Sequence, residues 1–362
     1  TPAVSGTSDQ LDVNVNVTEK PTGNLMLGVG TSSTDKIILS GSIAQNNFMG
    51  SGNNVAIQVN SAKSYRTYVF SYTNPYFTED GVSQGFDIYH RTVNTSSTAL
   101  ATYSSASTGA GLRFGFPIGE KEALGFGLGI DSTKVSAYDN SPQYYKDYVG
   151  YPTSPSVTKL SIPVTLNWTS DGKDSFFFPT KGTFQKAGIE VAVPGGDLTY
   201  YRATYQLQHF IPLNSKFTLM LNGEIGYASG YGGEALPFFK NFYAGGIGSV
   251  RGFKASSLGP ITGSGTGTEY RLGGNRRVIG NAEVLWSIPG MEKSFRMGWF
   301  VDAGQVYGDN GDKSSGGIRY STGLSAAWIS PIGPLKFSFG RPLNKQSDDK
   351  SEMFQFQLGT AF

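Results

Sequence analysis

Few residues in this chain of 362 have the types and spacing that catalysis or metal binding requires. The two histidines, His90 and His209, fall in different strand-like segments, and the chain has no cysteine. Thiol chemistry, a disulfide scaffold and the usual zinc ligand sets are therefore excluded. The glycine-rich "GGIGSVRG" (245–252) lacks the dinucleotide fingerprint, and no GxxxxGK[ST] sequence occurs. We expect no enzyme, no cofactor and no metal site, and we interpret both histidines as ordinary strand residues.

Arg251 offers a different kind of chemistry, because it lies in "VRGF" (250–253) within a long stretch without strand periodicity. That stretch, 229–275, is about 45 residues long, which is too long for a simple connection. Its apolar neighbours favour a loop tip that packs against protein. Glu283 and Asp302 follow on the polar faces of the next two strand-like segments, and a guanidinium between carboxylates forms charge-assisted, often bidentate hydrogen bonds. The alternative is a solvated surface arginine.

The composition limits which fold could position these residues. Charged residues make up 15% of the chain, aromatic residues 13%, and glycine is frequent at 49 residues. The charged fraction is well below the roughly 25% that is usual for soluble domains. The net charge of +2 gives no indication of a nucleic-acid partner. No stretch approaches the ~20 uninterrupted apolar residues of a transmembrane helix.

Apolar and polar residues alternate over long segments, most clearly in the last third of the chain. The residues that share the apolar faces include Val284, Trp299, Val301 and Leu324, whereas Gly298 and Ser325 fall on the polar faces. These segments are nearer ten residues long than the usual 5–6, and such strands span a bilayer when tilted by ~45°. A sheet in hydrocarbon must close, since an unpaired edge finds no water. The pattern predicts an all-β fold, a transmembrane antiparallel β-barrel, with a soluble β protein as the alternative.

Counting the segments gives about sixteen strands, an even number as expected for a bacterial barrel. The predicted strands start near Gly23, Lys36, Asn53, Arg66, Ser83, Tyr103, Ala123, Val157, Gly182, Thr199, Lys216, Arg276, Phe295, Gly317, Gly333 and Glu352. Short, proline-containing turns alternate with long connections such as 137–156 and 229–275. We expect the short turns to face the periplasm and the long loops to face the outside.

The first twenty residues differ from the remainder. "LDVNVNVTEK" (11–20) alternates strictly, and one amphipathic strand cannot fold alone. No signal peptide is visible at Thr1, so we expect a mature fragment of a longer chain. We interpret 1–20 as the last strand of a preceding domain, or as an overhang of the barrel, and 21–362 as the barrel itself.

A set of short motifs carries a resemblance to a known family. They are "NPYF" (74–77), "FFPTKG" (177–182), "NFYAGG" (241–246), "VRGF" with Val250, Arg251, Gly252 and Phe253, "FVDAG" (300–304), "SPIGPL" (330–335) and the terminal "FQFQLGTAF". Each motif is weak alone, but together, in this order and spacing, they resemble the BamA family of outer-membrane protein assembly factors. The resemblance extends from about Leu11 to Phe362.

The resemblance implies a sixteen-stranded barrel in the bacterial outer membrane, with the sixth extracellular loop folded into the lumen. Arg251 would contact the inner wall at Glu283 and Asp302, with Phe253 and Phe300 nearby. Residues 1–20 would be the end of a periplasmic POTRA domain. The implied function is assembly and insertion of outer-membrane β-barrel proteins without ATP. Its partners would be unfolded clients, membrane lipids and accessory lipoproteins that bind the missing POTRA domains.

The resemblance also implies a lateral gate between the first and last strands. The sequence offers reasons for weak pairing there, because glycine lowers the pairing and packing strength of a strand. The predicted gate residues are Gly23, Gly28 and Gly30 in the first strand, and Gln355, Gln357, Gly359 and Phe362 in the last. Two other functions stay open, a polypeptide secretion pore of the same superfamily and a passive diffusion porin.

Overall fold

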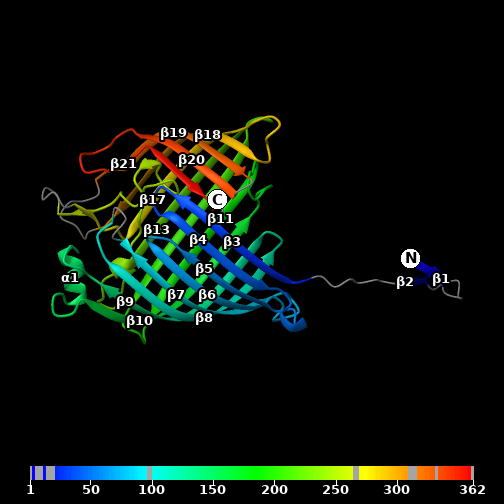
Figure 1. The fold of residues 1–362 in the computed structure, drawn as a ribbon, viewed down its shortest axis with the longest axis horizontal. Helices are drawn as coiled ribbons and strands as arrows, with labels where there is room; N and C mark the ends of the chain where they lie inside the picture. Colours follow the sequence, from blue (N-terminus) through cyan, green and yellow to red (C-terminus); the bar gives the residue numbers. More distant parts are fainter. Residues whose placement is uncertain are drawn as a thin grey trace.

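The chain forms a closed barrel of sixteen antiparallel strands in a computed structural model (Figure 1). The structure describes residues 2–4, 11–13, 21–95, 100–263, 269–308, 316–330 and 333–359. The barrel strands are β3 (Gly23–Ser32), β4 (Lys36–Gln45), β5 (Asn54–Ser61), β6 (Tyr65–Asn74), β7 (Ser83–Asn94), β8 (Ser104–Gly119), β9 (Glu122–Ser136), β10 (Ser156–Asp171), β11 (Gly182–Val193), β12 (Tyr200–Pro212), β13 (Phe217–Gly230), β17 (Arg276–Ser287), β18 (Phe295–Tyr307), β19 (Arg319–Ser330), β20 (Gly333–Pro342) and β22 (Phe354–Leu358).

The remaining elements lie in the connections and at the N-terminus. They are β1 (Pro2–Val4), β2 (Leu11–Val13), η1 (Phe48–Gly50), α1 (Gln143–Val149), η3 (Phe238–Lys240), β14 (Gly252–Phe253), β15 (Ile261–Thr262), β16 (Tyr270–Arg271) and β21 (Ser351–Glu352). No helix in the described ranges is long and apolar enough to cross a membrane. The long connections and α1 lie at one end of the barrel, and the N-terminus lies beyond the other (Figure 1).

The predicted antiparallel barrel and its sixteen strands are confirmed, and the observed starts lie within a few residues of the predicted ones. Two strands start two residues later than predicted, β19 at Arg319 instead of Gly317 and the last strand at Phe354 instead of Glu352. For the last strand, the reason is that Ser351 and Glu352 pair instead with Phe253 and Gly252 of the long loop. The barrel pairing of the last strand therefore begins later than its sequence pattern indicates.

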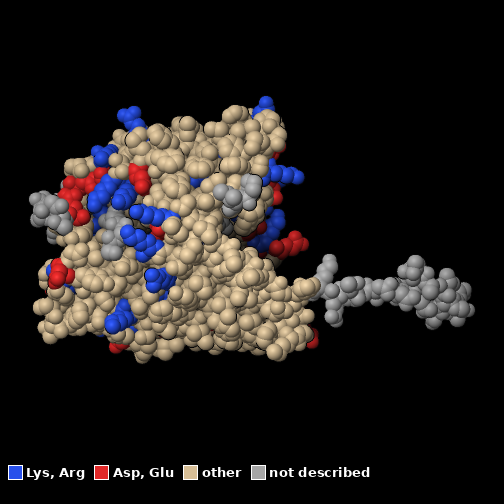
Figure 2. All heavy atoms as spheres, viewed as in Figure 1, with Lys and Arg blue, Asp and Glu red and all other residues tan. Residues whose placement is uncertain are grey.

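Register between strands fixes which side chains share a face. Val284, Trp299 and Leu324 lie side by side on the outer face, where Trp299 is 53% and Leu324 54% exposed. Their chain neighbours Glu283 and Phe300 point inward and are buried. Figure 2 shows the same division, because most of the visible wall is free of charged side chains. The wall thus presents an apolar band to lipid.

Arginine placed in this band is expected to cost much more than arginine in the lumen. Ile57 and Gln58 are neighbours in the middle of β5, the first on the outer face and the second on the inner face. Ile57→Arg should lower the free energy of unfolding by ~2–4 kcal/mol, since its charge enters hydrocarbon. Gln58→Arg, the matched control, should cost less. Thermal shifts of the folded band in heat-modifiability gels measure both, and the reverse ranking would contradict the strand register.

Two polar-face residues are not open lumen positions. A Cβ atom at Gly298 would lie 2.2 Å from Oε1 of Glu283, and Ser325 donates a hydrogen bond to the same carboxylate. A large substitution at either residue would therefore disturb the packing around Glu283.

The two short strands at the N-terminus form a sheet of their own. Pro2 pairs with Val13 and Val4 with Leu11 in antiparallel register, separately from the barrel sheet. Leu11–Val13 is the described part of the amphipathic stretch at 11–17. Assignment of 1–20 to a preceding domain stays a prediction.

Candidate functional site

The long connection between β13 and β17 carries the candidate site. It contains η3, β14, β15 and β16, and its side chains Val250, Phe253 and Leu258 are buried. These pack with Ile279 of β17 and Val306 of β18 in one apolar cluster. The described part of the connection, residues 231–263 and 269–275, therefore folds against the inner wall of the barrel, and we refer to it as the lumen loop.

Arg251 lies at the tip of the lumen loop between two carboxylates of the wall. Its Nε and one terminal nitrogen each donate to Asp302 at 2.8 Å, and its other terminal nitrogen donates to Glu283 at 2.8 Å. Its backbone N–H also donates to Asp302, at 3.0 Å. The guanidinium carbon lies 3.5 Å from the ring centroid of Phe300. Arg251 is 4% exposed and Asp302 is fully buried, so this is a desolvated bidentate ion pair.

The charge of Arg251 is secured by its neighbours. Burial alone lowers the pKa of an arginine, but hydrogen bonds to Asp302 and the charge of Glu283 outweigh burial and raise the pKa of Arg251 above its ordinary value. The guanidinium therefore stays protonated, as arginine ordinarily does in proteins. Such an arrangement can hold two parts of a structure together, and it offers no proton for acid or base catalysis.

A line of amides supports this ion pair from the side. Asn281 donates to Asp302 at 2.8 Å and to the backbone oxygen of Ser249 at 2.7 Å. Asn222 donates to Asn281 at 2.8 Å, and Gln206 donates to Asn222 at 3.0 Å. Only the register across β12, β13, β17 and β18 reveals this line of amides.

The lumen loop also binds the last strand. The backbone N–H of Gly252 donates to the side-chain oxygen of Gln355 at 3.4 Å, and the Gln355 amide donates to the backbone oxygen of Phe253 at 2.8 Å. Gly252 has a φ of +84°, and a Cβ atom there would lie 2.9 Å from the backbone of Gly340. Glycine is required at this close crossing. Gln355, which we expected only as a gate residue, thus joins the lumen loop to the last strand.

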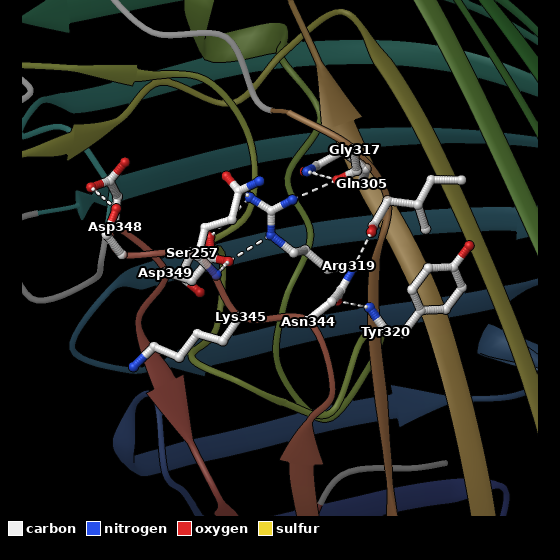
Figure 3. A network of polar contacts seen from close by, with 12 residues as sticks. Ser257, Gln305, Gly317, Arg319, Tyr320, Asn344, Lys345, Asp348 and Asp349 are labelled. Carbon is white, nitrogen blue, oxygen red and sulfur yellow. Dashed lines mark hydrogen bonds and ion pairs between the residues drawn. The ribbon is translucent and has the colours of Figure 1, made fainter.

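A second buried ion cluster near the extracellular end was not predicted (Figure 3). Arg319 of β19 donates to Asp349 at 2.5 Å and to the side chain of Gln346 at 2.7 Å. Arg271 of the lumen loop lies 3.4 Å from the same Asp349 and donates to the backbone oxygen of Gly259 at 2.7 Å. Asp349 therefore links the lumen loop and β19 to 343–350, the connection that leads into the last strand.

At the periplasmic end, Arg296 is a further buried arginine that joins elements distant in the sequence. It is 4% exposed and donates to the backbone oxygens of Phe178 at 3.0 Å and Pro179 at 2.7 Å. These two residues belong to the turn between β10 and β11, several strands away around the barrel. The "FFPTKG" turn thus folds under the lumen. No local pattern in the sequence indicates this contact.

The seam between the first and last strands has the shortest pairing among the described parts of the wall. There, β22 pairs with β3 at Gln357↔Ser32 and Leu358↔Thr31, and Ser33 donates a backbone hydrogen bond to Phe356, whereas β3 pairs with β4 along its whole length. Gly359 has a φ of +82°, and a Cβ atom there would lie 3.0 Å from the Cα atom of Gly30. A Cβ atom at Gly30 would lie 2.5 Å from the backbone oxygen of Leu358. Both glycines allow the strands to cross closely.

The other predicted gate residues lie apart from this contact. Gly23 and Gly28 pair with Gln45 and Ser40 of β4, and no described residue of β22 pairs with them at the other edge of β3. Phe362 lies outside the described residues. The structure therefore brings together Gly30, Gln357 and Gly359, while Gln355 contacts the lumen loop.

Neither histidine joins a cluster that could bind a metal. The ring Nδ1 of His90 lies 2.8 Å from Thr108, and that of His209 lies 2.8 Å from Thr183. Over the described ranges, no group of three or more histidine, aspartate or glutamate side chains has the arrangement of a metal site.

Comparison with known proteins agrees with this geometry. Residues 47–362 match the Omp85 superfamily domain. The chain is 36% identical to the outer membrane protein assembly factor BamA of Neisseria meningitidis over 99% of its length, and 28% identical to that of Nitratidesulfovibrio vulgaris over 98%. It covers 49% and 44% of those relatives, so it spans about half their length.

Solved structures of similar barrels cover the whole or nearly the whole of this chain. The crystal structure of BamA from Haemophilus ducreyi lacking POTRA domains 1–3 matches with a TM-score of 0.89 and 30% identity, covering all of this chain and 74% of that one. CdiB from Acinetobacter baumannii matches with a TM-score of 0.61 at 16% identity, over 99% of this chain and 64% of that one, which is a likeness of fold alone. The match to the superfamily domain over most of the barrel establishes that this chain belongs to the Omp85 superfamily.

Proposed function

We propose that this chain is the membrane domain of an outer-membrane protein assembly factor, which inserts β-barrel clients through the seam between β3 and β22. The observation that carries the proposal is the free edge of β3. From Gly23 to Gly30 this edge has no strand partner among the described residues, although the opposite edge is fully paired with β4. Leu25, Leu27 and Val29 on this strand are strongly exposed.

A free strand edge inside a membrane favours pairing with another strand. Its backbone N–H and C=O groups lack water, so each strand added by a client satisfies groups that are otherwise costly. Folding of the client then supplies the driving free energy, and neither a nucleotide nor a covalent step is needed. The short pairing at 31–32 lets the seam part without the loss of many hydrogen bonds.

The lumen loop would support this process by fixing the side of the seam that carries the last strand. Arg251 fixes the loop to β17 and β18, and Gln355 fixes the same loop tip to β22. The last strand would thus stay anchored while the first strand separates.

The partners of such an assembly factor would be unfolded outer-membrane proteins and the surrounding lipid, with accessory lipoproteins bound through POTRA domains that precede the barrel.

A polypeptide secretion pore of the same superfamily is the second candidate, because the match to the superfamily domain does not by itself separate it from an assembly factor. A passive diffusion porin is a third candidate.

Single-channel recording separates a porin from the other two candidates. A lumen filled by a loop should give small, flickering currents, whereas a porin should give large, stable ones. The number of POTRA domains upstream separates an assembly factor, with about five, from a secretion pore, with about two.

The full-length protein in liposomes is expected to speed the insertion of an unfolded β-barrel client without ATP. Insertion is measured by the appearance of the heat-modifiable, protease-protected form of the client. Liposomes with a diffusion porin of similar size serve as the control. If the client folds no faster than in the control liposomes, while a secreted polypeptide crosses the membrane, the secretion pore replaces assembly as the function.

A further inference from the structure

The outer wall carries a cationic hollow at the extracellular end of β6 to β9. It has a volume of about 300 Å³, and its lining includes Lys63, Arg66 and Lys134. All three side chains are exposed, and within the described residues none of them has an ion-pair partner. One carboxylate, Asp35, contacts the lining by accepting a hydrogen bond from Ser64. The hollow therefore keeps a net positive charge.

Strand register explains why a hollow forms there. Arg66, Thr92, Ala106 and Lys134 form one row across β6, β7, β8 and β9, all on the outer face. Neighbouring strands lie ~4.8 Å apart, so the two long basic side chains stand about 14 Å from each other. The two residues between them are small. A negatively charged group can therefore enter between the two cations.

Hydroxyl groups line the extracellular side of the same hollow. They belong to Ser104, Ser136 and Tyr138, and the hydroxyls of Ser104 and Tyr138 lie 2.8 Å apart. Cations together with hydroxyl donors form the set of groups that binds phosphate oxygens through charge-assisted hydrogen bonds. The chemistry of the hollow thus fits a phosphate-bearing ligand.

An apolar hollow lies on the same strands, closer to the middle of the membrane. It has a volume of about 510 Å³ and includes Ile88, Ala110 and Ile130, which form one row. The row between the two hollows contains His90 and Thr108, whose side chains are hydrogen-bonded at 2.8 Å. Successive outward residues lie ~6.8 Å apart along a strand, so both hollows fit within one lipid molecule. From the extracellular end toward the middle of the membrane, the outer face of β7, β8 and β9 therefore changes from cationic to apolar.

We propose that this face binds a phosphorylated lipid of the outer leaflet, with its phosphate between Arg66 and Lys134 and an acyl chain over Ala110. Charge selects the phosphate, and the apolar hollow directly below selects a lipid over a soluble phosphate. Figure 2 shows Lys and Arg gathered toward the end of the barrel that carries α1, where such headgroups lie. The site lies on β6 to β9, away from the seam between β3 and β22.

Native mass spectrometry of the protein with lipid A, a phosphorylated glycolipid, tests the proposal. The double variant Arg66→Ser/Lys134→Ser should bind lipid A about tenfold more weakly or worse, because two cations near the headgroup are lost. Ala106→Trp should lower binding similarly by filling the hollow while leaving every charge in place. Arg341→Ser is the matched control, since Arg341 is an exposed outward cation at the extracellular end of β20, outside the hollow. It should bind like wild type.

Competition experiments separate a lipid from a free anion. Dephosphorylated lipid A should bind weakly, and millimolar inorganic phosphate should fail to displace lipid A. Heat-modifiability gels confirm that each variant is folded. Unchanged binding by the double variant, or equal losses in it and in Arg341→Ser, would overturn the site. Complete displacement by inorganic phosphate would overturn the lipid as its ligand.

Discussion

Arg251→Ala is expected to lower the free energy of unfolding by ~3–5 kcal/mol, the cost of removing one partner from a buried ion pair. The substitution leaves Asp302, which is fully buried, and Glu283 without their cation. The lumen loop should then leave the wall and become accessible to protease. The temperature at which the folded band disappears in heat-modifiability gels measures stability, and limited proteolysis measures the release of the loop.

Three further variants sharpen this experiment. Arg251→Lys keeps the charge but cannot form the bidentate contact with Asp302. Its free energy of unfolding should therefore lie between those of the wild type and Arg251→Ala. Adding Glu283→Gln and Asp302→Asn to Arg251→Ala removes the orphaned charges and should restore part of the stability. Lys254→Ala, an exposed change in the same loop, is the control. An Arg251→Ala protein with a protected loop and the melting temperature of the wild type would show that the ion pair holds nothing in place.

A disulfide across the seam is expected to abolish assembly of other outer-membrane proteins while it is oxidised. Across the seam, the structure pairs Ser32 with Gln357. Paired antiparallel residues have Cα atoms ~4.5–5.5 Å apart, within the reach of a disulfide. Ser32→Cys/Gln357→Cys should therefore oxidise readily, and the bond would prevent any client strand from entering between β3 and β22. The chain has no native cysteine that could interfere.

Ser42→Cys/Gln58→Cys is the matched control for this experiment. It has the same residue types and also faces the lumen, but it joins β4 to β5 inside a continuous ladder. Its oxidation should leave assembly intact. Reduction should restore assembly in the seam variant, as followed by cell growth and by the folding of outer-membrane proteins. Normal growth with a fully oxidised seam would exclude lateral insertion and favour the secretion pore.

The alternating pattern of the chain was sufficient to predict much of the fold. A period of two assigns each residue to one face of its strand, so Trp299 and Leu324 could be placed outward and Glu283 and Asp302 inward. The unusual length of the segments then favoured a membrane barrel, and closure followed from the cost of an unpaired edge. The carboxylates nearest to Arg251 were predictable because they lie on the two strands that follow the loop.

Other features depend on register and on loop conformation, which no local pattern encodes. Arg319 and Asp349 are 30 residues apart, and Arg271 and Asp349 are 78 apart. Each looks like an ordinary charged loop or strand-end residue in the sequence. The hollow between Arg66 and Lys134 likewise exists only because three strand pairings place small residues between them.

The sequence by itself determined the class of fold and the inward and outward faces of the strands, and it offered Arg251 with two carboxylates on the polar faces of the following strands. The tertiary structure alone decided that the loop tip binds Gln355, that the last strand begins at Phe354, and that the described residues of β3 and β22 pair over a short stretch. The physical reason is that side-chain periodicity is a property of one strand. Pairing between the two ends of the chain depends on how the whole sheet closes.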